Sequence, residues 1–118
     1  MAFFGRHGVH PEEKQLGQPF HIDVEILSDL LPAGIKDDLT LTVDYGKVYA
    51  VVREIVEKES YNLIEAIAET IARRVLDYFS QIDSVLIRVR KPHAPLPGPF
   101  DYVEVEIVRK RSSTTPYY

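Results

Sequence analysis

Apolar and polar residues alternate in three segments of the chain, and each segment predicts a β-strand. The segments are residues 20–26, 85–89 and 103–107. In the first, Phe20, Ile22, Val24 and Ile26 fall on one face, while His21, Asp23 and Glu25 fall on the other. A period of two is typical of a strand with one buried face. The start of the chain, around Ala2, Phe3 and Phe4, predicts a further short strand.

Two longer segments repeat apolar residues at helical spacing. The first follows Asp44, a predicted N-cap, and extends to about Lys58. The second begins near Asn62, and its apolar stripe continues to Phe79. Asn62 and Glu65 have the spacing of a capping box, in which the glutamate would hydrogen bond back to the N-cap amide. Residues 30–38 contain Pro32 and Gly34 and are expected to be a connection.

The order of these elements predicts an α+β fold. Two strands precede the helix pair and two follow it, which suggests a four-stranded antiparallel sheet with both helices on one face. Residues 91–99 contain four prolines and are expected to form a stiff loop. Because such a sheet has two edges and one uncovered face, we expect the protein to associate with itself.

Length and composition set further bounds. The 118 residues suit one domain, expected over residues 1–111, followed by a polar tail at 112–118. Cysteine is absent, which excludes disulfide scaffolds and thiolate zinc sites. Apolar runs are too short for a membrane span, no secretory signal is evident, and a cytoplasmic location is expected. The net charge is −4 and basic residues are scattered, so nucleic-acid binding gains little support.

Candidate catalytic residues lie at the joints between the predicted elements. They are Glu12, Glu13, Tyr45, Glu65 and Lys91. Each also has a structural explanation: a solvated acidic turn for the first two, helix packing for Tyr45, capping for Glu65 and solvation for Lys91. The four histidines lack a typical zinc-ligand pattern, so no metal is expected.

Four blocks together resemble the dihydroneopterin aldolase family. The blocks are FFGRHGV with PEE and LGQ (residues 3–18), DDL with TVDY (37–45), NLIEAIAE (62–69) and KPHAPLPG (91–98). They follow the family's order and cover residues 2 to about 109. The resemblance implies a tunnelling fold, ββααββ, whose subunits form homo-oligomeric rings (tetramers or octamers) with active sites between subunits.

The reaction that the resemblance implies is a retro-aldol cleavage in folate biosynthesis. 7,8-Dihydroneopterin would give 6-hydroxymethyl-7,8-dihydropterin and glycolaldehyde, possibly with epimerisation at C2′. The C6=N5 imine of the pterin ring accepts the electron pair that bond cleavage releases. This carbon–carbon lyase therefore needs no cofactor, no metal and no Schiff base, only binding, proton transfer and charge stabilisation.

The resemblance also implies a role for each site residue. Glu65 would anchor the pterin through its 2-amino and N3 groups, and Ile64 and Val43 would add contacts from their backbone. Lys91 would stabilise charge near N5 and the side-chain hydroxyls. Tyr45, from the adjacent subunit, would transfer a proton. Glu13 would contact the substrate side chain or shape the loop over it.

Two departures from the family pattern leave alternatives open. The chain starts inside the family's first strand, and Pro99 stands where many bacterial members carry histidine. The alternatives are an epimerase of dihydroneopterin or its triphosphate, and a non-catalytic pterin- or purine-binding module. Arg6, Arg88 and Arg90 could serve a triphosphate, although the last two are also expected on a solvated strand face opposite Glu104 and Glu106. The presence of both Tyr45 and Lys91 favours the aldolase over an oxygenase variant or a binding module. A zinc-dependent pterin synthase of the same fold is disfavoured because this sequence lacks the histidine pattern of that enzyme.

Overall fold

A computed structural model describes residues 1–111, and the predicted tail at 112–118 lies outside the described residues. Its strands are β1 (Ala2–Gly5), β2 (Gln18–Ser28), β3 (Ile82–Lys91) and β4 (Val103–Lys110). Its α-helices are α1 (Pro11–Leu16), α2 (Leu31–Lys36), α3 (Tyr45–Lys58) and α4 (Ile64–Tyr78), with a 3₁₀ turn, η1, at Leu39–Leu41.

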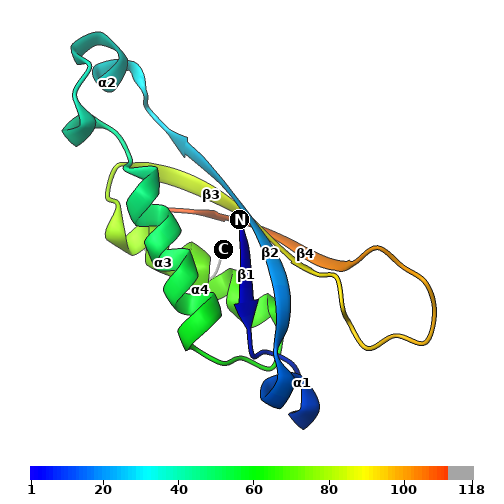
Figure 1. Cartoon of the computed structure of the whole chain (residues 1–118). Coiled ribbons are helices and arrows are strands. Elements are labelled where there is room, and N and C mark those ends of the chain that lie inside the picture. The colour runs from blue at the N-terminus through cyan, green and yellow to red at the C-terminus, as the bar shows by residue number, and fades with distance from the viewer. Residues whose placement is uncertain (112–118) are drawn as a thin grey trace.

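The four strands form one antiparallel sheet in the order β1-β2-β3-β4, and α3 and α4 lie against one face of it (Figure 1). The predicted α+β architecture is therefore confirmed. The alternating residues face the helices as expected, with Phe20, Ile22, Val85, Ile87 and Val89 buried. The apolar stripes of α3 and α4 bury their side chains against these residues and form a single core.

The two long helices begin differently. Asp44 caps α3 as predicted, because its side chain accepts a hydrogen bond from the Gly46 N–H at 2.9 Å. The predicted capping box of α4 is wrong. That helix begins at Ile64, after an N-cap at Leu63 that makes no side-chain cap bond. The side-chain oxygen of Asn62 instead accepts a hydrogen bond from Lys14 Nζ at 2.5 Å.

The connection predicted at residues 30–38 contains the short helix α2. Pro32 lies in its first turn, where a missing N–H costs no intrahelical hydrogen bond. The helix ends at Lys36, and its C-cap, Asp37, has a left-handed backbone and donates its N–H to the Ala33 carbonyl at 2.8 Å. Pro32 and Gly34 are therefore both accommodated within this six-residue helix.

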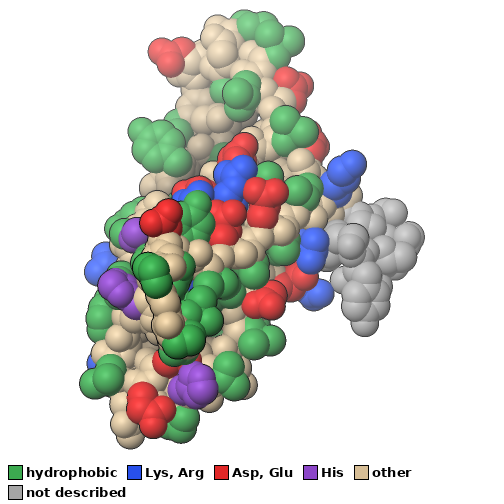
Figure 2. All heavy atoms as spheres, turned by 90° about the vertical axis from the view of Figure 1, so that its right-hand side faces the viewer, with side chains coloured by type: hydrophobic (Ala, Val, Ile, Leu, Met, Phe, Trp, Pro, Cys, Tyr) green, Lys and Arg blue, Asp and Glu red, His purple; other side chains and the backbone are tan. Residues whose placement is uncertain are grey.

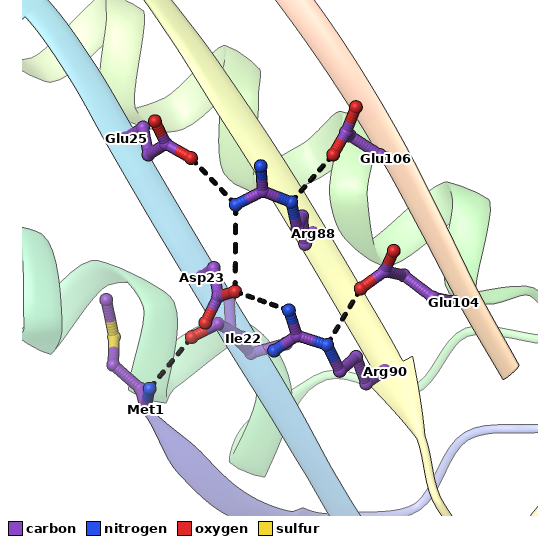
Figure 3. Close-up of polar contacts among 8 residues, drawn as sticks. All are labelled: Met1, Ile22, Asp23, Glu25, Arg88, Arg90, Glu104 and Glu106. Carbon is purple, nitrogen blue, oxygen red and sulfur yellow. Dashed lines mark hydrogen bonds and ion pairs between the residues drawn. The ribbon is translucent and has the colours of Figure 1, made fainter. Parts of the chain in front are cut away.

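Charged side chains cover the middle of the sheet face that the helices leave open (Figures 2 and 3). Arg88 pairs with Glu25 and Glu106 on the two neighbouring strands. Arg90, two residues later on β3, pairs with Asp23 and Glu104 on the same two strands. The residues are Asp23 and Glu25 on β2, Arg88 and Arg90 on β3, and Glu104 and Glu106 on β4. Hydrogen bonding to Arg90 holds the pKa of Asp23 below its ordinary value. The expected pairing of Arg88 and Arg90 with Glu106 and Glu104 is confirmed.

The molecule is elongated, with extents of 52 × 30 × 25 Å. Helix α1 lies at one end and α2 at the other (Figure 1). Within residues 1–111, no helix is both long and apolar enough to cross a bilayer. The two ends matter for the site, because the predicted catalytic residues divide between them.

Candidate active site

A buried ion pair joins Lys91 to Glu13. Lys91 Nζ lies 2.5 Å from Glu13 Oε2, and the two side chains are only 12% and 10% exposed. Lys91 is the last residue of β3, and Glu13 lies in the first turn of α1, so residues 78 positions apart in the chain meet here. The pair offers a cation and a carboxylate side by side, the groups that acid–base chemistry requires.

Three hydrogen bonds fix the Glu13 carboxylate, and their donors are Lys91, Gln18 and the backbone N–H of His10. Gln18 Nε2 donates to Oε2 at 3.1 Å, and the His10 N–H donates to Oε1 at 3.4 Å. Burial raises the pKa of Glu13, but the bonds from Lys91, Gln18 and His10 outweigh it, so the pKa lies below the ordinary value. Glu13 is therefore a carboxylate at neutral pH.

The expectation of a solvated turn at Glu12 and Glu13 is wrong for Glu13. Helix α1 turns it inward, while Glu12 remains exposed. Gly8 makes room for it: its φ is +149°, and a Cβ there would lie 2.4 Å from the Glu13 carboxyl carbon. Local sequence could not show this burial in full, because Lys91, which pairs with Glu13, comes from β3, and Gln18, which also bonds to it, is the first residue of β2.

Gln18 is a site residue whose role the sequence did not reveal. Its buried side-chain amide donates a hydrogen bond from Nε2 to Glu13. The amide oxygen, Oε1, is then left as a hydrogen-bond acceptor. Within residues 1–111, Oε1 has no hydrogen-bond partner. Turning the amide over would set its oxygen against the Glu13 carboxylate, so the observed orientation is the favourable one. An acceptor is thus available beside the ion pair.

The start of α4 lies at the same end of the molecule. The Gly8 N–H donates to the Tyr61 carbonyl at 3.0 Å, and Lys14 bonds to Asn62, so the segment around α1 is tied to the residues before α4. Ile64 is buried, while the Glu65 side chain is exposed in the first turn. Among the described residues, no hydrogen bond or ion pair occupies the Glu65 carboxylate, and backbone N–H groups at this helix start lack intrahelical partners.

Tyr45 and Val43 lie at the opposite end of α3. Tyr45 is the first residue of that helix and is 88% exposed, so the expectation of a half-buried packing role is wrong. Val56 lies near the other end of α3, beside the α1 region, and the helix between the two residues spans roughly 16 Å at 1.5 Å per residue. Tyr45 begins α3, and this end of the helix lies away from α1, which carries Glu13 (Figure 1). Within one chain, Tyr45 and Val43 are therefore separated from the Glu13–Lys91 pair and from the start of α4.

The arginines considered for a triphosphate are engaged elsewhere. Arg88 and Arg90 pair with carboxylates on the open sheet face. Arg6 donates to the carbonyl groups of Gln15 and Lys14 at the end of α1. The structure does not gather these cations into a phosphate site, which disfavours the triphosphate alternative.

Comparisons with known proteins agree with this architecture. The family model for dihydroneopterin aldolase (FolB) matches residues 1–108. A dihydroneopterin aldolase of Methylorubrum extorquens is 45% identical over 97% of this chain and 88% of its own. A crystal structure described as dihydroneopterin aldolase from Vibrio cholerae has a TM-score of 0.87 and 32% identity, covering 94% of this chain and 92% of that one. A complex of E. coli dihydroneopterin aldolase with neopterin has a TM-score of 0.83 and 28% identity, covering 92% and 91%. The resemblance in the sequence is confirmed, and the chain belongs to the dihydroneopterin aldolase family of lyases.

Proposed function

We propose that the Glu13–Lys91 pair carries a metal-independent retro-aldol cleavage of 7,8-dihydroneopterin. The C2′ hydroxyl loses its proton, the C1′–C2′ bond breaks, and C2′ becomes the aldehyde carbon of glycolaldehyde. The electron pair moves through C1′ into the C6=N5 imine, and protonation of C1′ gives 6-hydroxymethyl-7,8-dihydropterin. The observation that carries this proposal is the buried contact of 2.5 Å between Lys91 and Glu13.

The same contact argues against a Schiff base. A Schiff base needs a free amine nitrogen that can reach a carbonyl carbon, whereas Lys91 Nζ is held against Glu13 Oε2 at 2.5 Å. The ammonium can instead stabilise negative charge that develops near N5 and the side-chain oxygens. Because the pterin ring already accepts the electron pair, neither an enzyme imine nor a metal is needed.

Glu65 is the proposed anchor of the pterin ring. Its exposed carboxylate can accept two hydrogen bonds, from the 2-amino group and from N3–H, in the paired geometry that such groups favour. Backbone groups of Ile64 and Val43 would add contacts to the ring. Since Glu65 and Lys91 lie at the same end of the folded molecule, the anchored pterin ring would extend its side chain toward Lys91 and Glu13.

Tyr45 would complete the site from a neighbouring subunit. Its exposure and its distance from Lys91 within one chain are what a residue that serves the adjacent site should show. The phenol would transfer a proton at C1′ once the enol or enamine has formed. Val43, two residues earlier, would approach the pterin from the same subunit.

The sheet supports assembly into a ring of subunits. β1 forms one edge of the sheet and pairs with residues 18–21 of β2. β4 forms the opposite edge. Unpaired edges need partners, and we propose that edges of adjacent subunits satisfy each other in a homo-tetramer or octamer. A cytoplasmic location remains a prediction of the sequence.

The chemistry can be tested with two reagents. A chelator should leave glycolaldehyde formation unchanged, and borohydride added during turnover should not attach the substrate to the protein. Loss of activity with the chelator, restored by a divalent ion, would contradict metal independence. A stable adduct at Lys91 after borohydride would contradict the ammonium role. Conversion only to the C2′ epimer would favour the epimerase alternative.

The anchor can be tested by binding. Glu65→Gln should weaken binding of neopterin by about 1.5–3 kcal/mol, the worth of a hydrogen bond to a charged group. Glu54→Gln, an exposed glutamate on α3, is the matched control and should bind like the wild type. Equal binding by both variants would remove Glu65 from the site.

A further inference from the structure

His7 is a buried histidine that the proposed chemistry does not use. It lies two residues after the end of β1, and only 1% of its surface is exposed. Its Nε2 lies 2.7 Å from the Val56 carbonyl oxygen, and its Nδ1 lies 3.0 Å from the Tyr61 backbone nitrogen. The imidazole therefore connects the start of the chain to both sides of the turn between α3 and α4.

The partners of His7 determine its tautomer. A carbonyl oxygen can only accept, so Nε2 carries the hydrogen, and a backbone N–H can only donate, so Nδ1 is unprotonated. The ring is thus neutral, with both nitrogens satisfied. Phe20 meets it edge-on at 5.1 Å between centroids, and Tyr61 stacks on it at 6.0 Å. These contacts leave the ring one orientation.

The charges around His7 favour the same neutral form. Burial lowers the pKa of His7 most, the hydrogen bond to the Val56 carbonyl raises it, and the nearby Lys91 and Lys14 lower it further. Glu59, on the other side of the turn, acts in the opposite direction. The net shift is downward, so the neutral tautomer is the form present at neutral pH.

His7 lies between the two halves of the proposed site. Gly8, the next residue, donates to the Tyr61 carbonyl and packs against the Glu13 carboxyl group. Tyr61 itself is held by Glu59, which pairs with Arg74 on α4. The segment that carries Glu13 is therefore fixed to the turn that leads into α4 and Glu65.

We infer that neutral His7 is a positioning residue that sets the Glu13–Lys91 pair relative to the pterin anchor at the start of α4. This inference rests on the proposed function of those residues. His7 has no need to touch the substrate. A protonated ring would place a second N–H against the Tyr61 N–H, and the turn and the Gly8 segment would separate. The active geometry would then be lost in acid while the chain is still folded.

Three substitutions separate the two hydrogen bonds. In His7→Asn, the side-chain oxygen can take the place of Nδ1 and accept from Tyr61. In His7→Gln, the amide nitrogen can take the place of Nε2 and donate to Val56, while the acceptor is lost. His7→Leu removes both bonds but keeps an apolar side chain of moderate size. Thermal unfolding and size-exclusion chromatography check that each variant folds and assembles.

Turnover of 7,8-dihydroneopterin and binding of unsubstituted pterin are then compared. Pterin has no side chain, so its binding reports the anchor alone. We expect His7→Gln and His7→Leu to lose 10-fold or more in kcat, since small displacements of catalytic groups cost about this much or more. Pterin binding should change less than 3-fold. His7→Asn should keep most of the wild-type kcat, because its bond to Tyr61 remains.

The pH profile gives a readout that a packing role alone would not change. Wild-type kcat should fall in acid through a midpoint below about 6.5, the ordinary value for histidine. His7→Asn, which cannot be protonated there, should lack that step. A full step in His7→Asn, or wild-type kcat in folded His7→Leu, would overturn the inference.

A readout without turnover keeps this test apart from that of the proposed function. In ¹³C NMR, the Glu13 carboxyl of the wild type should titrate below its ordinary midpoint, and His7→Leu should move that midpoint upward. An unchanged midpoint would overturn the positioning role even if no variant turned over substrate. An inactive wild type with the expected NMR shift would instead contradict only the proposed function.

Discussion

Lys91 and Glu13 form a buried ion pair whose nitrogen and oxygen lie 2.5 Å apart, at the point where β3 ends and α1 begins. The two residues are 78 positions apart in the chain, yet the fold buries about nine-tenths of both side chains against each other. Charges are costly to bury unless they are paired and hydrogen bonded. This pair lies at the same end of the molecule as an exposed carboxylate, Glu65, in the first turn of α4, which is why we assign it to catalysis.

Removing Lys91 should lower both the stability and the activity of the protein, whereas removing an ordinary surface lysine should lower neither. In Lys91→Ala, Glu13 would stay buried without its cation, and the free energy of unfolding should fall by about 3–5 kcal/mol, the cost of breaking a buried pair. kcat should fall by about 100-fold or more, as when electrostatic stabilisation is removed. Chemical denaturation and steady-state kinetics measure the two effects.

Lys36→Ala is the matched control for this substitution. Lys36 is exposed at the end of α2, at the far end of the molecule. The control should change neither quantity measurably. Equal losses in the two variants would mean that Lys91 has no special role.

The stability of the fold should depend on pH through Glu13. Its pKa in the folded protein is below the ordinary value, so folding favours the carboxylate. The stabilisation is complete above the unfolded pKa, about 4.3 for glutamate, and is lost as the pH falls through the lower folded pKa. Thermal unfolding of the wild type and of Glu13→Gln from pH 7 to 3 measures this difference, which should shrink in acid. A difference that stayed constant over this range would contradict the linkage.

The division of the site between subunits predicts complementation. Tyr45→Phe and Lys91→Ala should each be weakly active alone, because each damages every site in its own assembly. When the two are unfolded and refolded together, some sites should combine an intact Tyr45 from one chain with an intact Lys91 from another. Cleavage activity should then rise above that of either variant, and a control refolding of each variant alone should not show the rise.

Failure of the mixed assembly to regain activity, with mixing verified by mass spectrometry, would place Tyr45 and Lys91 in the same chain's site or remove Tyr45 from catalysis. The separation of roughly 16 Å along α3 makes the first outcome difficult to reconcile with the fold.

Gly8 offers a test that leaves every charged group in place. Gly8→Ala would add a Cβ 2.4 Å from the Glu13 carboxyl carbon, at a φ of +149° that L residues rarely adopt. We expect kcat to fall by about 10-fold or more, because the Glu13 side chain must move. Gly98→Ala, in open space in the proline-rich loop, is the matched control. Wild-type kcat in Gly8→Ala would show that the position of Glu13 is not critical.

The sequence predicted the architecture well because that architecture depends on local periodicity. Alternation identified β2, β3 and β4, and the spacing of apolar residues identified α3 and α4. Asp44 was found as a cap because capping depends on residues only two positions away. The errors arose where distant residues decide. Asn62 was expected to cap α4, but Lys14, 48 positions earlier, takes its side-chain oxygen.

The site was predicted only in part, for the same reason. Resemblance identified Glu13, Lys91, Glu65 and Tyr45, but residue patterns alone gave each an ordinary structural explanation. The burial of Glu13 depends on β2 and β3, and the exposure of Tyr45 depends on what the fold leaves uncovered. His7 stood out only as one of four histidines and as a member of the FFGRHGV block, and its positioning role left no signal because its two partners are about 50 residues away. Such contacts are properties of the tertiary structure and leave no local signal.

The most direct test of the proposed function is anaerobic incubation of the purified wild type and Lys91→Ala with 7,8-dihydroneopterin, followed by chromatographic separation of the products. We expect the wild type to form equal amounts of 6-hydroxymethyl-7,8-dihydropterin and glycolaldehyde. Lys91→Ala should form them at a rate reduced by about 100-fold or more. Cleavage by Lys91→Ala at the same rate as by the wild type would contradict the central role of the Glu13–Lys91 pair.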